Sequence, residues 1–271
     1  VMGEGADEVS VDPNASVLIY SFRPPTPSSA AELTLRAGGM VSDPPQSVSQ
    51  VRFSPAGGLL LVSSITTLRG LSLPEITTGD PHLYPWEDIQ RALVIAKGKS
   101  GGGGGAGFVF DKHSSAILQF DCTIDEMYLQ SVDRGGDLLF YDLTKQRQEP
   151  SASKLADYNG ALGGEDEVGR QWASQTCVFG WAVQGIWPPH SYDSTEINAV
   201  DRDARCKLLA TAEDSGQIRV LRYPSVVPNS QSVVLTGHSS HVTNVKWANG
   251  GQLISVGGND KCVFVWDLHE K

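Results

Sequence analysis

The residues of this chain best placed to do chemistry lie in its last forty or so positions, between 234 and 268. They are His238, Ser255, Asp260 and Trp266. A histidine, a carboxylate and a serine could form a hydrolase triad, in which the imidazole takes a proton from the serine hydroxyl. No nucleophile elbow accompanies these residues, so the sequence gives no catalytic residue and we expect no enzyme.

The elements that must position these side chains are short strands. The segment from Val242 to Trp247 alternates between the two faces of a strand, and a Gly-Gly turn and a second apolar segment follow it. A polar turn then leads to a third strand, which ends in Trp266-Asp267. Such segments, separated by Gly, Asn and Asp turns, predict antiparallel hairpins. With Gly237-His238 in front, the pattern resembles a WD40 repeat, one four-stranded blade of a β-propeller.

In that repeat the polar residues form a buried hydrogen-bond relay. We expect His238 to accept a hydrogen bond from Trp266 Nε1 and to pair with Asp260. Each polar group then has a partner, so the set can be buried at little desolvation cost. WD40 repeats close the set with a serine or threonine on the second strand. The aligned position here is Val256, with Ser255 beside it, so the sequence leaves the fourth member open.

A weaker copy of the relay lies in residues 108–143. His113 takes the place of the repeat's histidine, although Lys112 replaces the preceding glycine. Ser131 stands at the serine position of the second strand, and Tyr141-Asp142 stands at the Trp-Asp position. Tyrosine keeps an aromatic ring with a polar tip, so we predict a relay of altered form.

Strand and turn patterns extend over the whole chain and predict an all-β WD40 β-propeller. We expect about four blades plus a partial blade, the C-terminal part of a larger propeller array. The predicted segments are a blade remnant at 1–36, a blade at 48–97, a flexible glycine-rich loop at 98–107, a blade at 108–143, a loop at 171–192, a blade at 196–235 and the last blade at 236–268. We expect residues before Val1 to cover the open strand edges.

Charge and hydropathy exclude several classes of partner. The net charge is −10 and the isoelectric point is about 5.0. Such a chain does not attract nucleic acid by charge, and its basic residues do not cluster along the sequence. No apolar segment is long enough to cross a membrane, and the first residues do not resemble a signal peptide.

The sequence also predicts neither a metal ion nor a cofactor. Its 4 cysteines are far apart and lack CxxC spacing, so we expect buried thiols. Gly98-Lys99-Ser100 resembles the end of a phosphate-binding loop. However, Leu93 occupies the position where that motif needs its first glycine, so we reject a nucleotide site.

Residues 172–266 resemble the C-terminal part of the echinoderm microtubule-associated-protein-like family. Residues from His113 to Asp142 also match, and those from Ser16 to Phe22 match weakly, so the resemblance covers about half of the chain. The matching residues are Trp172, Thr176-Cys177-Val178, Gly180, Val183, Gly185-Ile186-Trp187-Pro188, Thr195-Glu196-Ile197-Asn198, Arg222-Tyr223-Pro224, the segment from Gly237 to Val245, Gly257-Gly258, Asp260 and Trp266.

The resemblance implies a function and a place in the cell. Family members have two atypical β-propellers in tandem, and this chain resembles the end of the second. They associate with microtubules and bind tubulin through the propellers, whereas an N-terminal coiled coil and basic segment, outside this chain, supply oligomerisation. We therefore expect a cytoplasmic, cytoskeletal protein, at the cilium or spindle. An acidic propeller is repelled by tubulin's acidic surface unless specific patches meet.

Loops at the propeller faces are the expected contact sites, because loops carry the variable chemistry of this fold. The candidate partner-binding residues are Trp181, Trp187 and His190 in the loop at 171–192, and Ser239, Ser240 and His241 in the last blade. Packing of the tryptophans onto the propeller surface is the structural alternative. A second function also stays open, a WD40 scaffold in signalling or assembly without tubulin binding.

Overall fold

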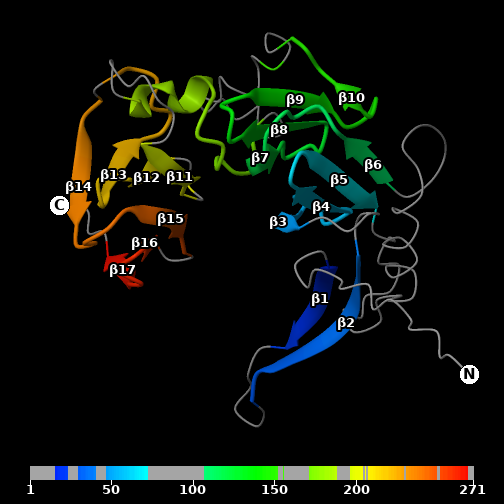
Figure 1. The fold of residues 1–271 in the computed structure, drawn as a ribbon, viewed down its shortest axis with the longest axis horizontal. Coiled ribbons are helices and arrows are strands. Elements are labelled where there is room, and N and C mark those ends of the chain that lie inside the picture. Colours follow the sequence, from blue (N-terminus) through cyan, green and yellow to red (C-terminus); the bar gives the residue numbers. More distant parts are fainter. Residues whose placement is uncertain are drawn as a thin grey trace, which may run out of the picture. The chain divides into compact units, whose positions relative to one another are not determined.

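The computed structural model describes residues 16–23, 30–40, 47–72, 107–151, 155, 171–187, 196–203, 205, 207–228, 230–248 and 251–267. The strands in these ranges form five sheets with antiparallel pairing, which confirms the all-β prediction (Figure 1). The chain divides into two compact units, Val1–Ile117 and Leu118–Lys271. None of the described helices has the length and apolar character needed to span a bilayer.

The first unit contains a two-stranded and a four-stranded sheet. Strands β1 (Ser16–Arg23) and β2 (Glu32–Met40) pair in the first, inside and just beyond the predicted blade remnant. The second has the order β3 (Val48–Phe53), β4 (Leu59–Ser64), β5 (Thr67–Ser72) and β6 (Gly107–Phe110).

The fourth strand of this sheet corrects the predicted blade boundaries. Leu68 of β5 pairs with Phe110 of β6, so residues 107–110 close this blade instead of opening the next one. Residues 73–97 of the predicted blade lie outside the described residues, as does most of the predicted glycine-rich loop. Periodicity marks a strand but not its hydrogen-bonding partner, which here comes from a distant part of the chain.

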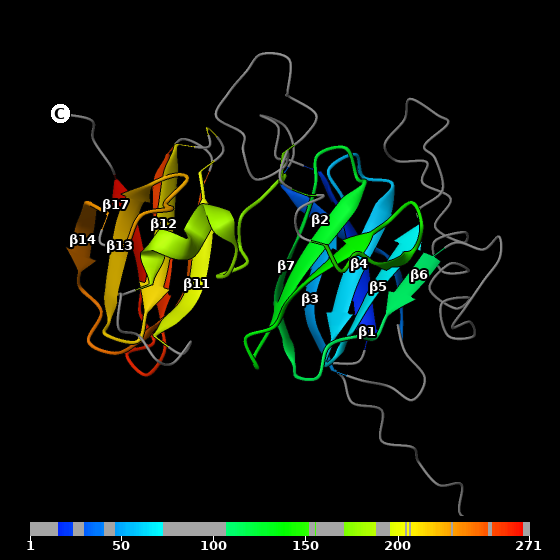
Figure 2. The same ribbon diagram turned by 90° about the horizontal axis from the view of Figure 1, so that it is seen from above.

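The described residues of the second unit form three sheets and the 3₁₀ helix η4 (Figures 1 and 2). Its elements in chain order are β7 (Ile117–Cys122), β8 (Tyr128–Asp133), β9 (Leu138–Asp142), β10 (Arg147–Gln148), η4 (Trp181–Ile186), β11 (Ile197–Arg202), β12 (Leu208–Glu213), β13 (Gln217–Arg222), β14 (Ser232–Thr236), β15 (Val242–Trp247), β16 (Gln252–Gly257) and β17 (Val263–Asp267). The third blade therefore runs from 117 to 148, since β10 lies beyond the predicted end at 143.

The last two sheets pack face to face through small residues. Ala199, Ala210 and Ala212 are buried on the face of the β11–β14 sheet that meets β15. Their short side chains leave room for Trp247 and Val245, which are buried in the same cluster. Each large apolar side chain buried in this way contributes about 1.5–3 kcal/mol, so the contact fixes one blade against the next.

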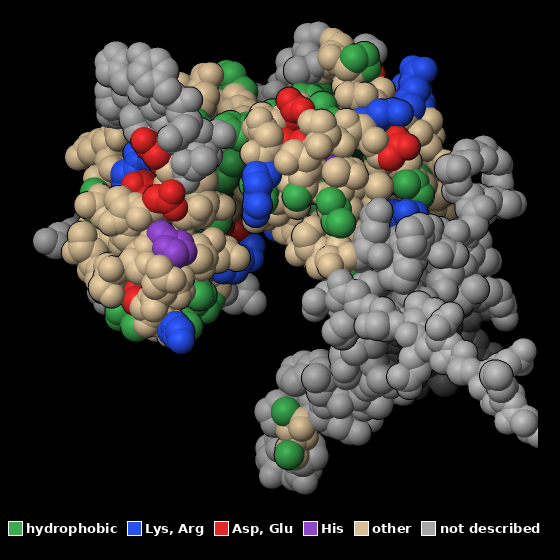
Figure 3. Space-filling view, viewed as in Figure 1, with side chains coloured by type: hydrophobic (Ala, Val, Ile, Leu, Met, Phe, Trp, Pro, Cys, Tyr) green, Lys and Arg blue, Asp and Glu red, His purple; other side chains and the backbone are tan. Residues whose placement is uncertain are grey.

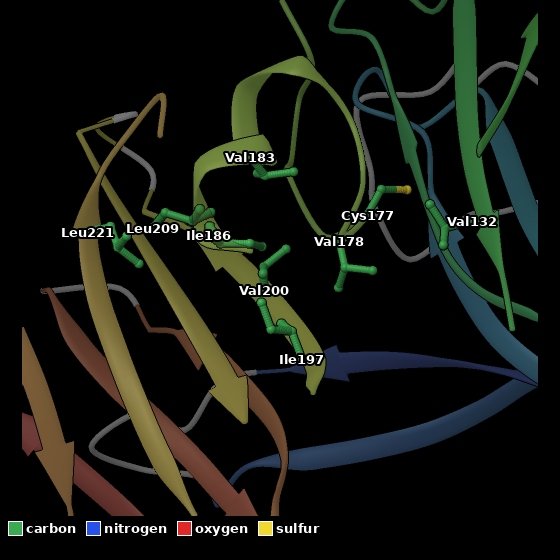
Figure 4. Packing of buried hydrophobic residues seen from close by; sticks show 9 residues of the cluster. All are labelled: Val132, Cys177, Val178, Val183, Ile186, Ile197, Val200, Leu209 and Leu221. Atoms are coloured by element: carbon green, nitrogen blue, oxygen red, sulfur yellow. The ribbon is translucent and has the colours of Figure 1, made fainter. Parts of the chain in front are cut away.

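Segment 171–187 fills the space between the β7–β10 sheet and the β11–β14 sheet. Val183 and Ile186 of η4 are buried together with Val132 of β8 and with Val200 and Leu209 of the following blade (Figure 4). Figure 2 shows η4 lying against the β11–β14 sheet. The segment is thus part of the core on one side and leaves only its other side for contact with a partner.

Candidate interaction site

In the last blade a chain of hydrogen bonds joins four side chains. His238 Nδ1 lies 2.9 Å from Asp260 Oδ2, and His238 Nε2 lies 2.8 Å from Ser255 Oγ. Trp266 Nε1 donates to the same Ser255 oxygen at 2.9 Å. The four groups run from the turn between β16 and β17 into the blade, and each polar atom named here has a partner within the set.

The relay differs from the expected one in its fourth member. Ser255 stands between His238 and Trp266, so the tryptophan does not donate to the histidine directly. Val256 points to the opposite face and is 38% exposed. The reason is the two-residue period of a strand, which turns Leu253, Ser255 and Gly257 together toward the buried side.

The geometry of Asp260, His238 and Ser255 resembles a hydrolase triad, but the serine is closed to substrates. Ser255 is 0% exposed, and its oxygen already accepts a hydrogen bond from Trp266 Nε1. A nucleophile must reach a carbonyl carbon, and this hydroxyl reaches only its own blade. A Cβ at position 257 would overlap both His238 and Asp260, which explains the glycine there.

The predicted relay of the third blade is divided between the two units. His113 belongs to the first unit, and Ser131 and Tyr141 belong to the second. All three side chains are buried. Their role as a relay therefore stays a prediction.

Asp142, next to Tyr141, fixes the turn into β10. Its Oδ1 accepts hydrogen bonds from Thr144 Oγ1 at 2.6 Å and from the Lys145 amide at 2.9 Å, and Lys145 Nζ lies 2.7 Å from its Oδ2. Burial acts to raise the pKa of the Asp142 carboxyl, but the hydrogen bonds from Lys145 and Thr144 outweigh it and lower the pKa to about 2.

Asp260 of the relay also has a lowered pKa. The hydrogen bond from the Cys262 amide contributes most, burial opposes it, and His238 and the Ser239 amide add to the lowering. The carboxylate is thus ionised at neutral pH and holds His238 on one side and the turn on the other.

Two buried aspartates that the sequence did not single out hold neighbouring segments together. Asp121 of β7 accepts hydrogen bonds from Ser174 Oγ at 2.6 Å, Thr176 Oγ1 at 2.9 Å and the Cys177 amide at 2.9 Å. Asp201 of β11 accepts from the Trp247 amide at 2.7 Å. Each is the fifth residue of the first strand in its sheet, and this repeated position is the signal that could have found them.

Two of the three tryptophans in the predicted loop are structural. Trp172 is buried and packs on Leu155. Trp187 donates its Nε1 hydrogen to the Val178 carbonyl at 3.1 Å and stacks on Phe179 with ring centroids 5.2 Å apart. The alternative of structural packing therefore describes Trp172 and Trp187.

Trp181 is the tryptophan that faces outward. It is 41% exposed, although Ala182, Val183 and Ile186 of the same helical turn are buried. Gly180 before it has φ of 129°, a backbone conformation that side chains other than glycine rarely adopt. The turn therefore holds the indole on the surface of a rigid support.

The segment after β13 is hydrogen-bonded to the helical turn η4 that carries Trp181. The Gly185 amide donates to the Ser225 carbonyl at 2.8 Å, and the Ser225 amide donates to the Ala182 carbonyl at 2.8 Å. Val227 follows on this segment and is 62% exposed. We call Trp181 and Val227 the apolar surface.

The other candidate residues lie at the opposite end of β13. A Cβ on Gly216, which precedes β13, would meet the carbonyl oxygens of His238 and Ser240, whereas the apolar surface follows the end of β13. Ser239 is exposed, and Ser240 and His241 are half-buried. Six residues of strand separate the two sites by about 20 Å. His190 lies outside the described residues.

In the described ranges no group of three or more His, Cys, Asp or Glu residues could hold a metal ion. Figure 3 shows a histidine at the surface of the second unit with acidic side chains around it.

The fold belongs to the class of WD40 β-propellers. The chain is similar to the C-terminal WD40 domain of Sif2, with a TM-score of 0.53 and 17% sequence identity, over 93% of this chain and 63% of that one. At this identity the likeness shows the fold alone.

Sequence comparison then identifies the family. Residues 106–268 match the model of the echinoderm microtubule-associated protein second β-propeller, and the chain belongs to this family. The predicted resemblance is thereby confirmed.

Individual relatives show the same relationship. The chain is 36% identical to echinoderm microtubule-associated protein-like 4 of Xenopus laevis over 160 residues, which are 59% of this chain and 16% of that protein. It is 31% identical to the 77 kDa echinoderm microtubule-associated protein of Strongylocentrotus purpuratus over 220 residues, 80% of this chain and 27% of that protein. The chain thus spans less than a third of the curated relatives that it matches.

Proposed function

We propose that this chain is a non-enzymatic scaffold that contacts tubulin through the apolar surface of Trp181 and Val227. The carrying observation is that Trp181 is exposed while every other described side chain of η4 that is apolar is buried. Rigid, exposed tryptophans are frequent centres of protein interfaces, because they bury a large area at a small cost in conformational entropy.

Family membership supports the choice of partner. The relatives are named microtubule-associated proteins, which supports tubulin as the ligand and the cytoskeleton as the location. The family-model match also includes the whole segment that presents Trp181. A WD40 scaffold in signalling or assembly is the alternative, and it predicts no affinity for tubulin.

The test is co-sedimentation or pull-down with soluble tubulin. Trp181→Ala should weaken binding by about tenfold or more, as expected for a central interface residue. Phe53→Ala removes another exposed aromatic ring, in the first unit, and should leave binding within about twofold. Circular dichroism would show that both variants remain folded.

Trp187 is unsuited to this test, since its loss would remove the hydrogen bond to Val178 and the stacking on Phe179. Absence of tubulin binding by the unaltered chain would contradict the proposed function. Equal binding by Trp181→Ala and the unaltered chain would contradict the assignment of this surface.

A further inference from the structure

One end of the fourth blade gathers positive charge in a chain that is acidic overall. The turn between β11 and β12, the end of β13 and the end of β15 lie together there. The Tyr223 amide donates to the Lys207 carbonyl at 2.8 Å, and Lys246 Nζ reaches Asp201 Oδ1 at 2.6 Å. The cations at this end, which we call the basic cluster, are Arg202, Arg205, Lys207, Arg222 and Lys246.

The acidic groups among these residues are buried and already occupied. Asp201 accepts from the Trp247 amide and from Lys246, and Asp203 accepts from the Lys207 amide at 2.7 Å and the Leu208 amide at 2.8 Å. Five cations and two carboxylates leave a local charge of +3, against −10 for the whole chain. The carboxylates thus fix the backbone and do not cover the cations.

Several cations of the basic cluster are exposed to solvent and are held in place by hydrogen bonds or ring contacts. The side chains of Lys246 and Arg205 are 64% and 57% exposed while each holds a buried aspartate. Arg202 donates to the Trp172 carbonyl at 2.6 Å and lies over the ring of Tyr223, 5.1 Å from its centroid. A ligand therefore meets cations whose positions are largely set before binding, which lowers the entropic cost of association.

Lys207 and Arg222 are the members available for a new ion pair. Within the described ranges, no carboxylate forms a salt bridge with either side chain. Lys207 directly precedes β12 and Arg222 ends β13, so both lie at the same end of the sheet, where Leu208 pairs with Arg222. Side chains one register position apart leave opposite faces of a sheet, so a short acidic segment that crosses this end of the blade can meet both charges.

We infer that the basic cluster binds an acidic peptide segment of the partner protein. The inference deepens the proposed function, on which it rests for the identity of that partner. A short run of Asp and Glu matches a cluster that covers only the turn between β11 and β12 and the ends of β13 and β15. A long polyanion such as RNA would meet the repulsion of the remaining acidic surface, because nucleic-acid grooves need positive charge along many residues.

Acidic groups on neighbouring sheets limit where such a peptide can lie. The turn that contains Asp125 and Glu126 lies near Arg202. The Ile124 amide donates to the Gln171 carbonyl, and Arg202 donates to the carbonyl of the next residue, Trp172. Asp267 lies at the end of β17 and accepts from Gln252. The peptide is therefore confined to the turn between β11 and β12 and to the ends of β13 and β15.

The experiment measures fluorescence anisotropy of a labelled oligoglutamate peptide with the whole chain. Lys207→Glu/Arg222→Glu should weaken binding by about tenfold or more, and added salt should weaken it further. Arg134→Glu/Lys261→Glu is the matched control, since it reverses one arginine and one lysine on other turns and should leave binding within about twofold. Lys207→Gln/Arg222→Gln gives a milder loss if the double reversal unfolds the blade.

The outcomes separate this inference from the proposed function. Trp181→Ala should bind oligoglutamate like the unaltered chain even if it loses tubulin. No binding of oligoglutamate by the unaltered chain, or equal losses in both double reversals, would overturn the inference and leave tubulin binding by Trp181 untouched. Oligouridylate that binds as tightly, with the same dependence on Lys207 and Arg222, would also overturn it in favour of a general polyanion site.

Discussion

Ser255 connects His238 Nε2 and Trp266 Nε1, two atoms of the last blade that have no other partner within the relay. Its oxygen lies 2.8 Å from His238 Nε2 and accepts the Trp266 Nε1 hydrogen at 2.9 Å. A buried donor or acceptor that loses its partner costs about 1–3 kcal/mol. The relay is therefore expected to stabilise the blade, because its polar groups are hydrogen-bonded to one another.

Ser255→Ala tests this role. We expect the free energy of unfolding to fall by about 2 kcal/mol or more, because His238 Nε2 and Trp266 Nε1 both lose the Ser255 hydroxyl as their partner. Urea denaturation measures the change. The neighbouring Val256→Ala, on the exposed face, should cost less than about 1 kcal/mol. Equal effects of the two substitutions would mean that the hydroxyl contributes nothing beyond its volume.

Asp142 should give the protein a dependence on acid. Its folded-state pKa of about 2 lies below the value of about 3.9 for an aspartate in an unfolded chain. The carboxylate therefore adds stability above about pH 4 that is lost as the pH falls toward 2. Asp142→Asn removes this contribution, so its unfolding free energy should fall less steeply between pH 4 and 2. Parallel curves for the two proteins would contradict the assignment.

At the scale of elements, Asp121 attaches segment 171–187 to the third blade. Its carboxylate receives donors from Ser174, Thr176 and Cys177, and the bridge between Thr123 and Trp172 lies beside it. The segment lacks strand pairing along most of its length, so these bonds take the place of a strand ladder. They also position the helical turn that carries Trp181.

Asp121→Ala should release that segment. We expect the free energy of unfolding to fall by about 3 kcal/mol, because several buried donors lose a charged acceptor. Hydrogen exchange of the Thr176 and Cys177 amides should become faster than that of the β12 amides. The control is Asp125→Ala, since Asp125 also accepts two hydrogen bonds, from Thr123 and Met127, but is exposed. Unchanged exchange at Thr176 would show that the apolar contacts alone hold the segment.

At the scale of the molecule, the two candidate contact sites lie at opposite ends of β13. The apolar surface follows its C-terminal end, and Ser240 and His241 lie near its N-terminal end. A small contact centred on one site would leave the other exposed, because about 20 Å of strand lies between them. The basic cluster shares the end of β13 with the apolar surface.

Ser240→Ala/His241→Ala should therefore leave tubulin binding within about twofold, in contrast to the loss of about tenfold for Trp181→Ala. If both variants weaken binding, their free-energy losses should add within about 0.5 kcal/mol when combined, since they share no contacts. Titration of labelled tubulin with each variant measures this. A loss confined to the Ser240/His241 variant would move the contact to the other end of the blade.

The sequence by itself determined the strands and the family. The alternation in segments such as Val242–Trp247 and the glycines and aspartates between them are local signals, and a strand needs only local alternation to be recognised. The order of motif residues from Trp172 to Trp266 was enough to indicate the family, which the comparison confirmed. The acidic composition likewise follows from counting alone.

Only the tertiary structure decided which groups meet. It paired β6 with β5, placed Ser255 instead of Val256 in the relay, and stacked Trp187 on Phe179 while exposing Trp181. It also brought cations from three strand ends into one basic cluster. These outcomes depend on hydrogen bonds and packing between residues far apart in the chain, and periodicity along a single strand carries no information about such partners.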